Sequence, residues 1–61
     1  MTPKQIKAIR RALRLTQQQL ADMIAATQVT VARWETGVSR PTGAYEMLLR
    51  QLAEKAKRKA R

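Results

Sequence analysis

The sequence contains no cysteine and no histidine, and only four of its 61 residues are aspartate or glutamate. These absences exclude disulfide bonds, thiolate or imidazole ligands for a metal, and the side chain that most often acts as a general base. A chain of this length forms one small domain with a modest core. We therefore expect no enzymatic activity, no bound metal and no cofactor.

Aromatic residues are also scarce, because phenylalanine is missing and only Trp34 and Tyr45 are present. A platform that stacks the bases of RNA or of single-stranded DNA would lack its usual side chains. No apolar run approaches the roughly 20 residues that a membrane-spanning helix needs, and the first residues contain no apolar signal core. We expect a cytoplasmic, nucleoid-associated protein.

Positive charge is what the sequence has in excess. Thirteen Lys and Arg residues against four acids give a net charge of +9 and a pI near 11.6. Such a surplus in a small domain indicates a polyanionic partner, either nucleic acid or an anionic membrane surface. A basic amphipathic peptide on a membrane is therefore an alternative. Helix caps and boundary Gly and Pro residues are typical of a folded domain, so we favour nucleic acid and expect no membrane partner.

Apolar residues recur at helical spacing in four segments, and no segment shows the alternation typical of a strand, which predicts an all-α fold. The first segment opens with Pro3 after Thr2, a candidate N-cap. The second opens with Thr16 and Gln19, whose spacing is that of a capping box. The inward faces of these two segments consist of Ile6, Ile9, Leu13, Leu20, Ala21 and Ile24.

The third segment follows Thr27, another cap candidate, and ends at Gly37, with Val31 and Trp34 on its core side. Pro41 then prevents the helix from continuing and disfavours helical geometry at Arg40. The fourth segment can be capped by Thr42 and closes the core with Tyr45, Leu48, Leu49 and Leu52. Gly43 near its first turn is a weak point that capping must offset.

The residues from Lys55 onward have high helix propensity but no apolar stripe beyond alanine. We expect them to extend the fourth helix as a basic tail, which lies along phosphates or serves only solubility. The predicted division is a DNA-binding domain over residues 1–54 and a C-terminal tail over residues 55–61.

Two short helices separated by about three residues form a helix-turn-helix, whose second helix can enter the major groove of DNA. Gln28 can form paired hydrogen bonds to adenine, and Arg33 can bind guanine in a bidentate manner. Val29 or Thr30 can place methyl groups against thymine. The alternative is that all four are ordinary exposed residues of a helix over about 28–36.

More than ten positions across these helices together resemble the Cro and phage-repressor type of helix-turn-helix transcription regulators, the XRE-like family. The resemblance covers residues 9–52 and rests on Leu15-Thr-Gln, Gln19-Leu-Ala, Thr27-Gln, Val31-Ala-Arg-Trp-Glu, Gly37 and Pro41. It implies a compact four-helix domain of the lambda-repressor-like type. It also places Gln28, Val29 and Arg33 at base-reading positions.

The resemblance implies further roles for single residues. An ion pair between Arg10 and Glu35 would lock the reading helix to the scaffold. Ala25 stands where relatives commonly have glycine, so it either carries strain or changes the turn. Contacts to DNA phosphates are expected from Gln17, whose amide should be exposed at a helix start, and from Thr27, Arg10, Arg14, Arg40 and Thr42.

These features predict sequence-specific binding of double-stranded DNA by a transcriptional regulator, with repression as the expected mode. One reading helix covers few base pairs, so we expect a homodimer on a pseudo-palindromic operator. Met47, Leu49 and Leu52 are candidates for its contact surface; the alternative is that all three belong to the core of the monomer. The alternative is an antitoxin that binds a toxin partner and autoregulates its operon.

Overall fold

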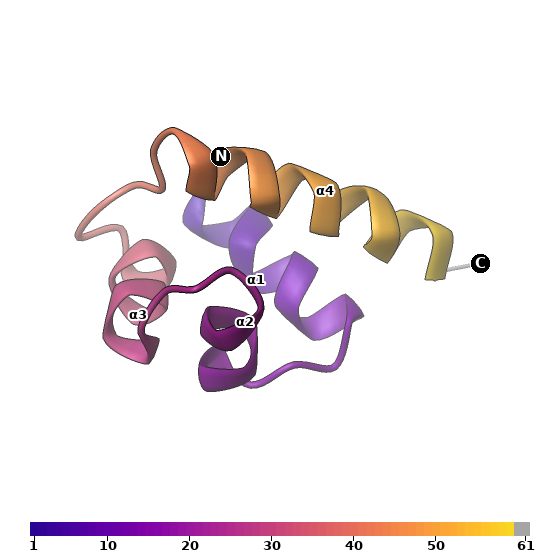
Figure 1. Cartoon of the computed structure of the whole chain (residues 1–61), viewed down its shortest axis with the longest axis horizontal. Helices are drawn as coiled ribbons and strands as arrows, with labels where there is room; N and C mark the ends of the chain where they lie inside the picture. Colours follow the sequence, from indigo (N-terminus) through magenta and orange to yellow (C-terminus); the bar gives the residue numbers. More distant parts are fainter. Residues whose placement is uncertain (60–61) are drawn as a thin grey trace.

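Four α-helices form the fold, and the computed structural model describes residues 1–59. They are α1 (Pro3–Ala12), α2 (Gln17–Met23), α3 (Gln28–Thr36) and α4 (Ala44–Lys59). Figure 1 shows α4 as the longest helix, lying across α1 on one side of the molecule, with α2 and α3 on the other side. The predicted all-α fold is confirmed, since the described part of the chain contains helices and no strand.

The starts of α1, α2 and α3 are fixed by the side chains that the sequence indicated, whereas the expected cap Thr42 does not adjoin α4, which begins at Ala44. Thr2 and Gln5 form a capping box at α1, and Thr16 and Gln19 form a second one at α2. At α3 the Thr27 hydroxyl accepts the backbone N–H of Thr30 at 3.2 Å. Each cap provides a partner for N–H groups that lack one within the helix, and each fixes where its helix begins.

A residue with a left-handed backbone conformation follows each of the first three helices. Gly37 ends α3 with φ of +82°, and its N–H is directed at the last carbonyls of that helix. Arg14 and Ala25 both have φ of +57° in the turns that follow α1 and α2. The alanine in the turn therefore keeps the left-handed geometry and carries the backbone strain that glycine would avoid.

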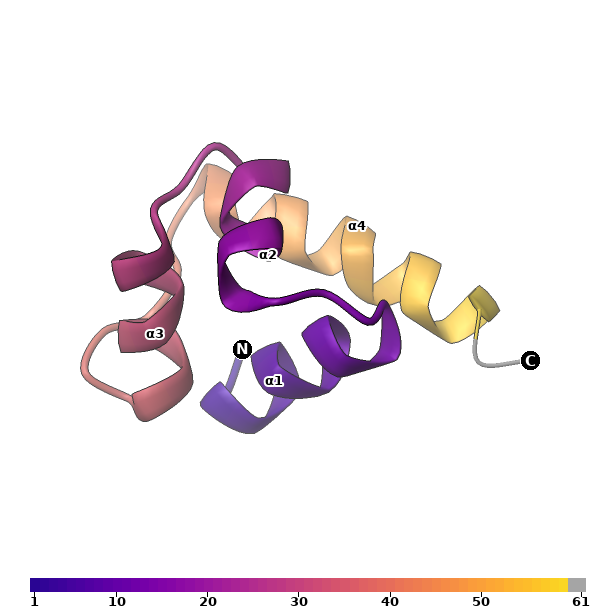
Figure 2. The same cartoon turned by 90° about the horizontal axis from the view of Figure 1, so that it is seen from below.

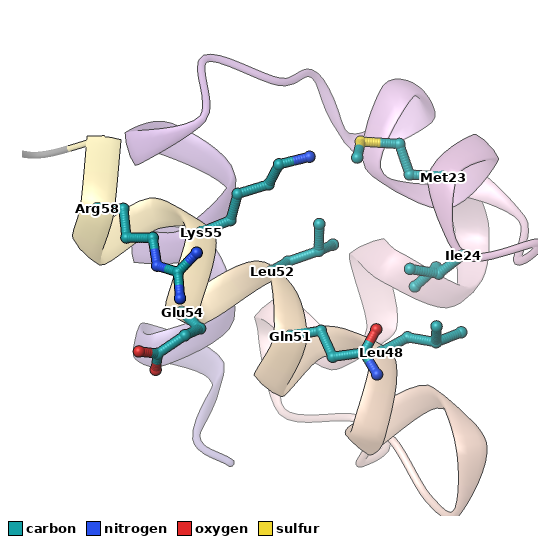
Figure 3. Close-up of a pocket in the computed structure, with 8 residues that line it drawn as sticks. All are labelled: Met23, Ile24, Leu48, Gln51, Leu52, Glu54, Lys55 and Arg58. Carbon is teal, nitrogen blue, oxygen red and sulfur yellow. The ribbon is translucent and has the colours of Figure 1, made fainter.

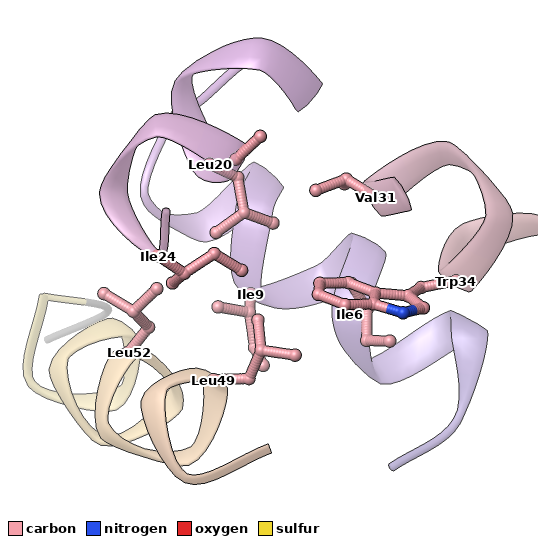
Figure 4. Packing of buried hydrophobic residues seen from close by; sticks show 9 residues of the cluster. Ile6, Ile9, Leu20, Ile24, Val31, Trp34, Leu49 and Leu52 are labelled. Atoms are coloured by element: carbon pink, nitrogen blue, oxygen red, sulfur yellow. The ribbon is translucent and has the colours of Figure 1, made fainter. Parts of the chain in front are cut away.

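One apolar core joins the four helices. Ile6, Leu20, Val31 and Leu49 are each fully buried and come from α1, α2, α3 and α4 in turn. Figure 4 shows these side chains meeting at the centre of the molecule, with the Trp34 ring beside Ile6. Nine buried residues make up this cluster, so a single small core positions every helix, as the chain length predicted.

The structure corrects the expectation for Gly43 and decides between the two expectations for Leu49 and Leu52. Gly43 lies before the helix with φ of +51°, a conformation that glycine adopts without the steric penalty of other residues, so it is not a weak point within the first turn. Leu49 is fully buried and Leu52 is 9% exposed. Both belong to the core and are not available for a dimer surface, whereas Met47 is 65% exposed.

The helix α4 continues without a break across the expected boundary between residues 54 and 55. Ala56 beyond that boundary is buried. The division into a domain and a tail therefore stays a prediction, and residues 60–61 of the expected tail lie outside the described residues. Among the helices of residues 1–59, none combines the length and apolar character needed to cross a membrane.

Candidate nucleic-acid interface

The helices α2 and α3 and the short turn between them form the candidate interface. Figure 2 shows the two helices side by side, joined by the turn over residues 24–27. Val31 and Trp34 anchor α3 in the core with 0% and 3% of their surface exposed. Because these residues hold one face of α3 against the core, the opposite face of the helix points outward.

Of the four predicted base-reading residues of α3, two lie on its outward face and two lie beside it. Val29 is 54% exposed, Arg33 is exposed, and Gln28 and Thr30 are half-buried. The only acid on α3 is Glu35, which is 4% exposed. The accessible surface of this helix therefore presents hydrogen-bonding, small apolar and cationic groups, which suit a polyanion.

Arg10 of α1 and Glu35 of α3 form an ion pair at the inner side of this interface. Arg10 Nε donates to Glu35 Oε2 at 2.7 Å and Nη2 donates to Oε1 at 3.0 Å. The third guanidinium nitrogen, Nη1, donates to the backbone carbonyl of Leu15 at 3.1 Å. Arg10 therefore joins α1, the loop before α2, and α3 through one planar group.

The surroundings of this ion pair shift the pKa of both partners. Burial acts to raise the pKa of Glu35, but hydrogen bonds from Arg10 and Gln17 outweigh it and hold the pKa below its ordinary value. The hydrogen bond to Glu35 raises the pKa of Arg10. Glu35 is therefore a carboxylate at neutral pH, and its charge is compensated within the protein.

A chain of side-chain hydrogen bonds continues from this ion pair to Gln28, the first residue of α3. Gln17 Nε2 donates to Glu35 Oε1 at 3.1 Å, and Gln28 Nε2 donates to Gln17 Oε1 at 2.6 Å. The sequence predicted an exposed Gln17 amide, but this side chain is half-buried. The two glutamine contacts join residues 11 and 18 positions apart, and no pattern in a single sequence indicates them.

The other four residues predicted to contact phosphate lie in loops or next to helix ends. Arg14 follows α1, Thr27 precedes α3, and Arg40 and Thr42 lie in the loop before α4; all four are exposed. None of the four takes part in an ion pair within residues 1–59. Arg10 differs from them, since all its guanidinium nitrogens already donate to groups within the protein.

Comparison with protein families identifies this pair of helices. A family model described as "Helix-turn-helix" matches residues 6–45, well over half of the chain. The chain therefore belongs to the Cro/C1-type helix-turn-helix family, as its sequence motifs indicated. As a member of this family it is a DNA-binding transcription regulator that binds double-stranded DNA. Comparisons with curated proteins and with solved structures found no match.

Proposed function

We propose that the protein represses transcription as a homodimer, with α3 of each subunit in the major groove of one half-site of a pseudo-palindromic operator. The observation that supports this proposal is the hydrogen-bond chain from Arg10 through Glu35 and Gln17 to Gln28. It links the scaffold helix α1 to the first residue of the reading helix. A side chain held in this way loses less conformational entropy when it binds a base.

The contact with Gln17 leaves Gln28 able to recognise adenine. A glutamine amide has two N–H donors and one acceptor oxygen. One donor of Gln28 is directed to Gln17, and the second donor and the oxygen match adenine N7 and N6–H, respectively. Gln17 therefore acts as the residue that orients the adenine-reading group, in addition to the phosphate contact proposed for its own second N–H.

The other three residues of the reading face complete the proposed base contacts. Arg33 is exposed and has no ion-pair partner in the described part of the chain, so its guanidinium is available for O6 and N7 of guanine. Val29 provides an exposed apolar surface for a thymine methyl group. The Thr30 hydroxyl lies 2.8 Å from that of Thr27 within the helix cap, so we assign Thr30 a methyl contact.

Phosphate contacts by Gln17, Thr27, Arg14, Arg40 and Thr42 would fix the position of the duplex. These contacts orient the reading helix but carry no sequence information themselves. A dimer covers two half-sites about one helical turn apart, and Met47 is the exposed apolar residue of α4 on which we centre its contact. Repression follows if the seated dimer excludes other proteins from the same base pairs.

Selection of bound duplexes from a random library, followed by competition with scrambled duplex, tests this function. We expect a two-fold-symmetric consensus that is bound at least about a thousandfold more tightly than scrambled duplex at physiological salt. Arg33→Ala should relax the preference at one base position of each half-site, whereas Arg40→Ala should weaken all duplexes equally. Equal binding of the selected and scrambled duplexes by the unmodified protein would refute the proposal.

A further inference from the structure

A groove between the end of α2 and residues 48–58 of α4 contains none of the residues proposed to contact DNA. Its volume is about 440 Å³, which lies within the usual range for binding sites in proteins. Figure 3 shows it open to the outside, with α2 on one side and α4 on the other. Its lining residues are Met23, Ile24, Leu48, Gln51, Leu52, Glu54, Lys55 and Arg58.

The floor of the groove is apolar and one of its edges is adaptable. Ile24 and Leu52 are nearly buried, while Met23 is 50% exposed at the mouth. In Figure 3 the side chains of Met23 and Lys55 extend toward each other from the two sides of the opening. A flexible thioether at such an edge can adjust to an apolar side chain that enters the groove.

The α4 side of the groove is predominantly cationic. Lys55 and Arg58 are both exposed there and form no ion pair within residues 1–59, whereas Glu54 is the one acid of the lining. The whole chain carries a net charge of +9. A ligand that combines an apolar ridge with negative charge complements this surface.

The lining residues come from the end of α2, from Ile24 directly after it and from α4, and none comes from α3. A duplex contacted by Gln28 and Arg33 would therefore not fill the groove. A small molecule is a poor match, because drug-sized ligands are largely enclosed by their pockets. This groove is open, and half of the Met23 surface is accessible.

We propose that this groove binds an acidic amphipathic helix of a partner protein, with an apolar side chain between Met23 and Leu52 and carboxylates beside Lys55 and Arg58. Binding of an amphipathic helix in a hydrophobic groove is a common mode of recognition. A second copy of this chain is disfavoured as the occupant, because its four acids, of which Glu35 is buried, provide few carboxylates for Lys55 and Arg58. The proposal goes beyond DNA binding and does not depend on it.

A synthetic helical peptide with leucines at i, i+3, i+4 and i+7 and glutamates on the flanking positions is the probe. We would record the methyl resonances of Met23 and Met47 in the full chain labelled at methionine. Met47 lies on α4 outside the groove and is 65% exposed, which makes it an internal control. The Met23 resonance should shift in a saturable manner while that of Met47 stays unchanged.

Two charge-reversal variants form a matched pair. Lys55→Glu and Lys57→Glu change the net charge equally, and both positions are exposed on α4. Only Lys55 lines the groove. We expect Lys55→Glu to weaken peptide binding at least about fivefold and Lys57→Glu to weaken it less than about twofold. Equal losses in the two variants would overturn the proposal, since they would show attraction by net charge alone.

Two further measurements separate the remaining explanations. An excess of random-sequence duplex should leave the Met23 shift in place; loss of the shift would place the peptide on the DNA interface and refute the proposal.

Dilution of the protein without peptide should also leave the Met23 resonance unchanged. A concentration-dependent shift would identify the groove as a contact between copies of this chain, which contradicts the assignment. Failure of peptide binding would leave the selection of an operator unaffected.

Discussion

Glu35 Oε2 lies 2.7 Å from Arg10 Nε although the two residues are 25 positions apart. The side chain of Glu35 is 1% exposed and that of Arg10 is 18% exposed. A carboxylate this deeply buried is tolerated because its charge is compensated and its oxygens accept hydrogen bonds. The pair therefore holds α3 in a defined position against α1. It thereby also sets the orientation of the outward face of α3.

Removing one partner of this pair should be strongly destabilising. Arg10→Met would leave Glu35 buried without its cation, and we expect a loss of about 3 kcal/mol in the free energy of unfolding. In a domain of this size each kcal/mol lowers the melting temperature by roughly 4–8 °C. Thermal unfolding followed by circular dichroism measures the effect.

The double variant Arg10→Met with Glu35→Leu is the control, because replacing both members of a buried pair with apolar residues is often nearly neutral. It should recover most of the stability lost in Arg10→Met. If the double variant were as unstable as the sum of the two single changes, the pairing would not account for the loss.

The lowered pKa of Glu35 predicts how stability depends on pH. Its ordinary pKa is about 4.3, and in the folded state the value lies below that. The folded state therefore binds this proton less readily, so the contribution of Glu35 is fully present above about pH 4.3 and is lost as the pH falls through the folded-state pKa. Denaturant unfolding of Glu35→Gln should show a flatter profile below pH 5. A profile parallel to that of the unmodified protein would disprove this assignment.

The positions of the helices were predictable because their signals are local. Thr16 and Gln19 are three residues apart, and the capping box they form needs no information from elsewhere in the chain. Gly43 was misjudged because a glycine next to a helix start can lie inside or outside the helix, and its positive φ depends on the path of the loop. The burial of Leu49 and Leu52 follows from their helical spacing with Tyr45 and Leu48, which places them on the apolar face of α4.

The candidate site was predictable only in part. The outward direction of Arg33 and the inward direction of Trp34 follow from helical spacing once the core face is known. The Arg10–Glu35 pair was expected from family resemblance. The contact of Gln17 with Gln28 depends on the relative placement of α2 and α3, so no local pattern in the sequence carries it.

The strained turn at Ala25 offers a direct test of the backbone geometry. A non-glycine residue in the left-handed region costs about 1–2 kcal/mol, whereas glycine adds about 0.5–1 kcal/mol of chain entropy to the unfolded state. Ala25→Gly should therefore raise the free energy of unfolding by about 0.5–1 kcal/mol. Ala8→Gly, at an exposed position within α1, is the matched control and should lower it by about 1 kcal/mol. Destabilisation by both changes would contradict the left-handed geometry at Ala25.

The hydrogen bond between Gln17 and Gln28 predicts that these residues act together on DNA. Gln28→Ala should abolish the preference at one adenine, and Gln17→Ala should both weaken all sites and reduce that same preference. A double-mutant cycle on the selected operator should give a coupling of about 1 kcal/mol, or roughly fivefold in affinity. Additive losses in the double variant would show that Gln17 contacts phosphate without orienting Gln28.

The salt dependence of DNA affinity distinguishes basic residues that contact phosphate from those that do not. Each phosphate contact contributes a slope of about −0.9 to the logarithm of affinity against the logarithm of salt concentration. Arg40 is exposed in the loop after α3, so Arg40→Ala should reduce the magnitude of the slope by about one contact per subunit. Arg50→Ala removes the same charge from α4, where Arg50 pairs with Glu46 at 3.3 Å, and should leave the slope unchanged. Equal changes of slope in the two variants would show that net charge, not a contact at Arg40, determines the salt dependence.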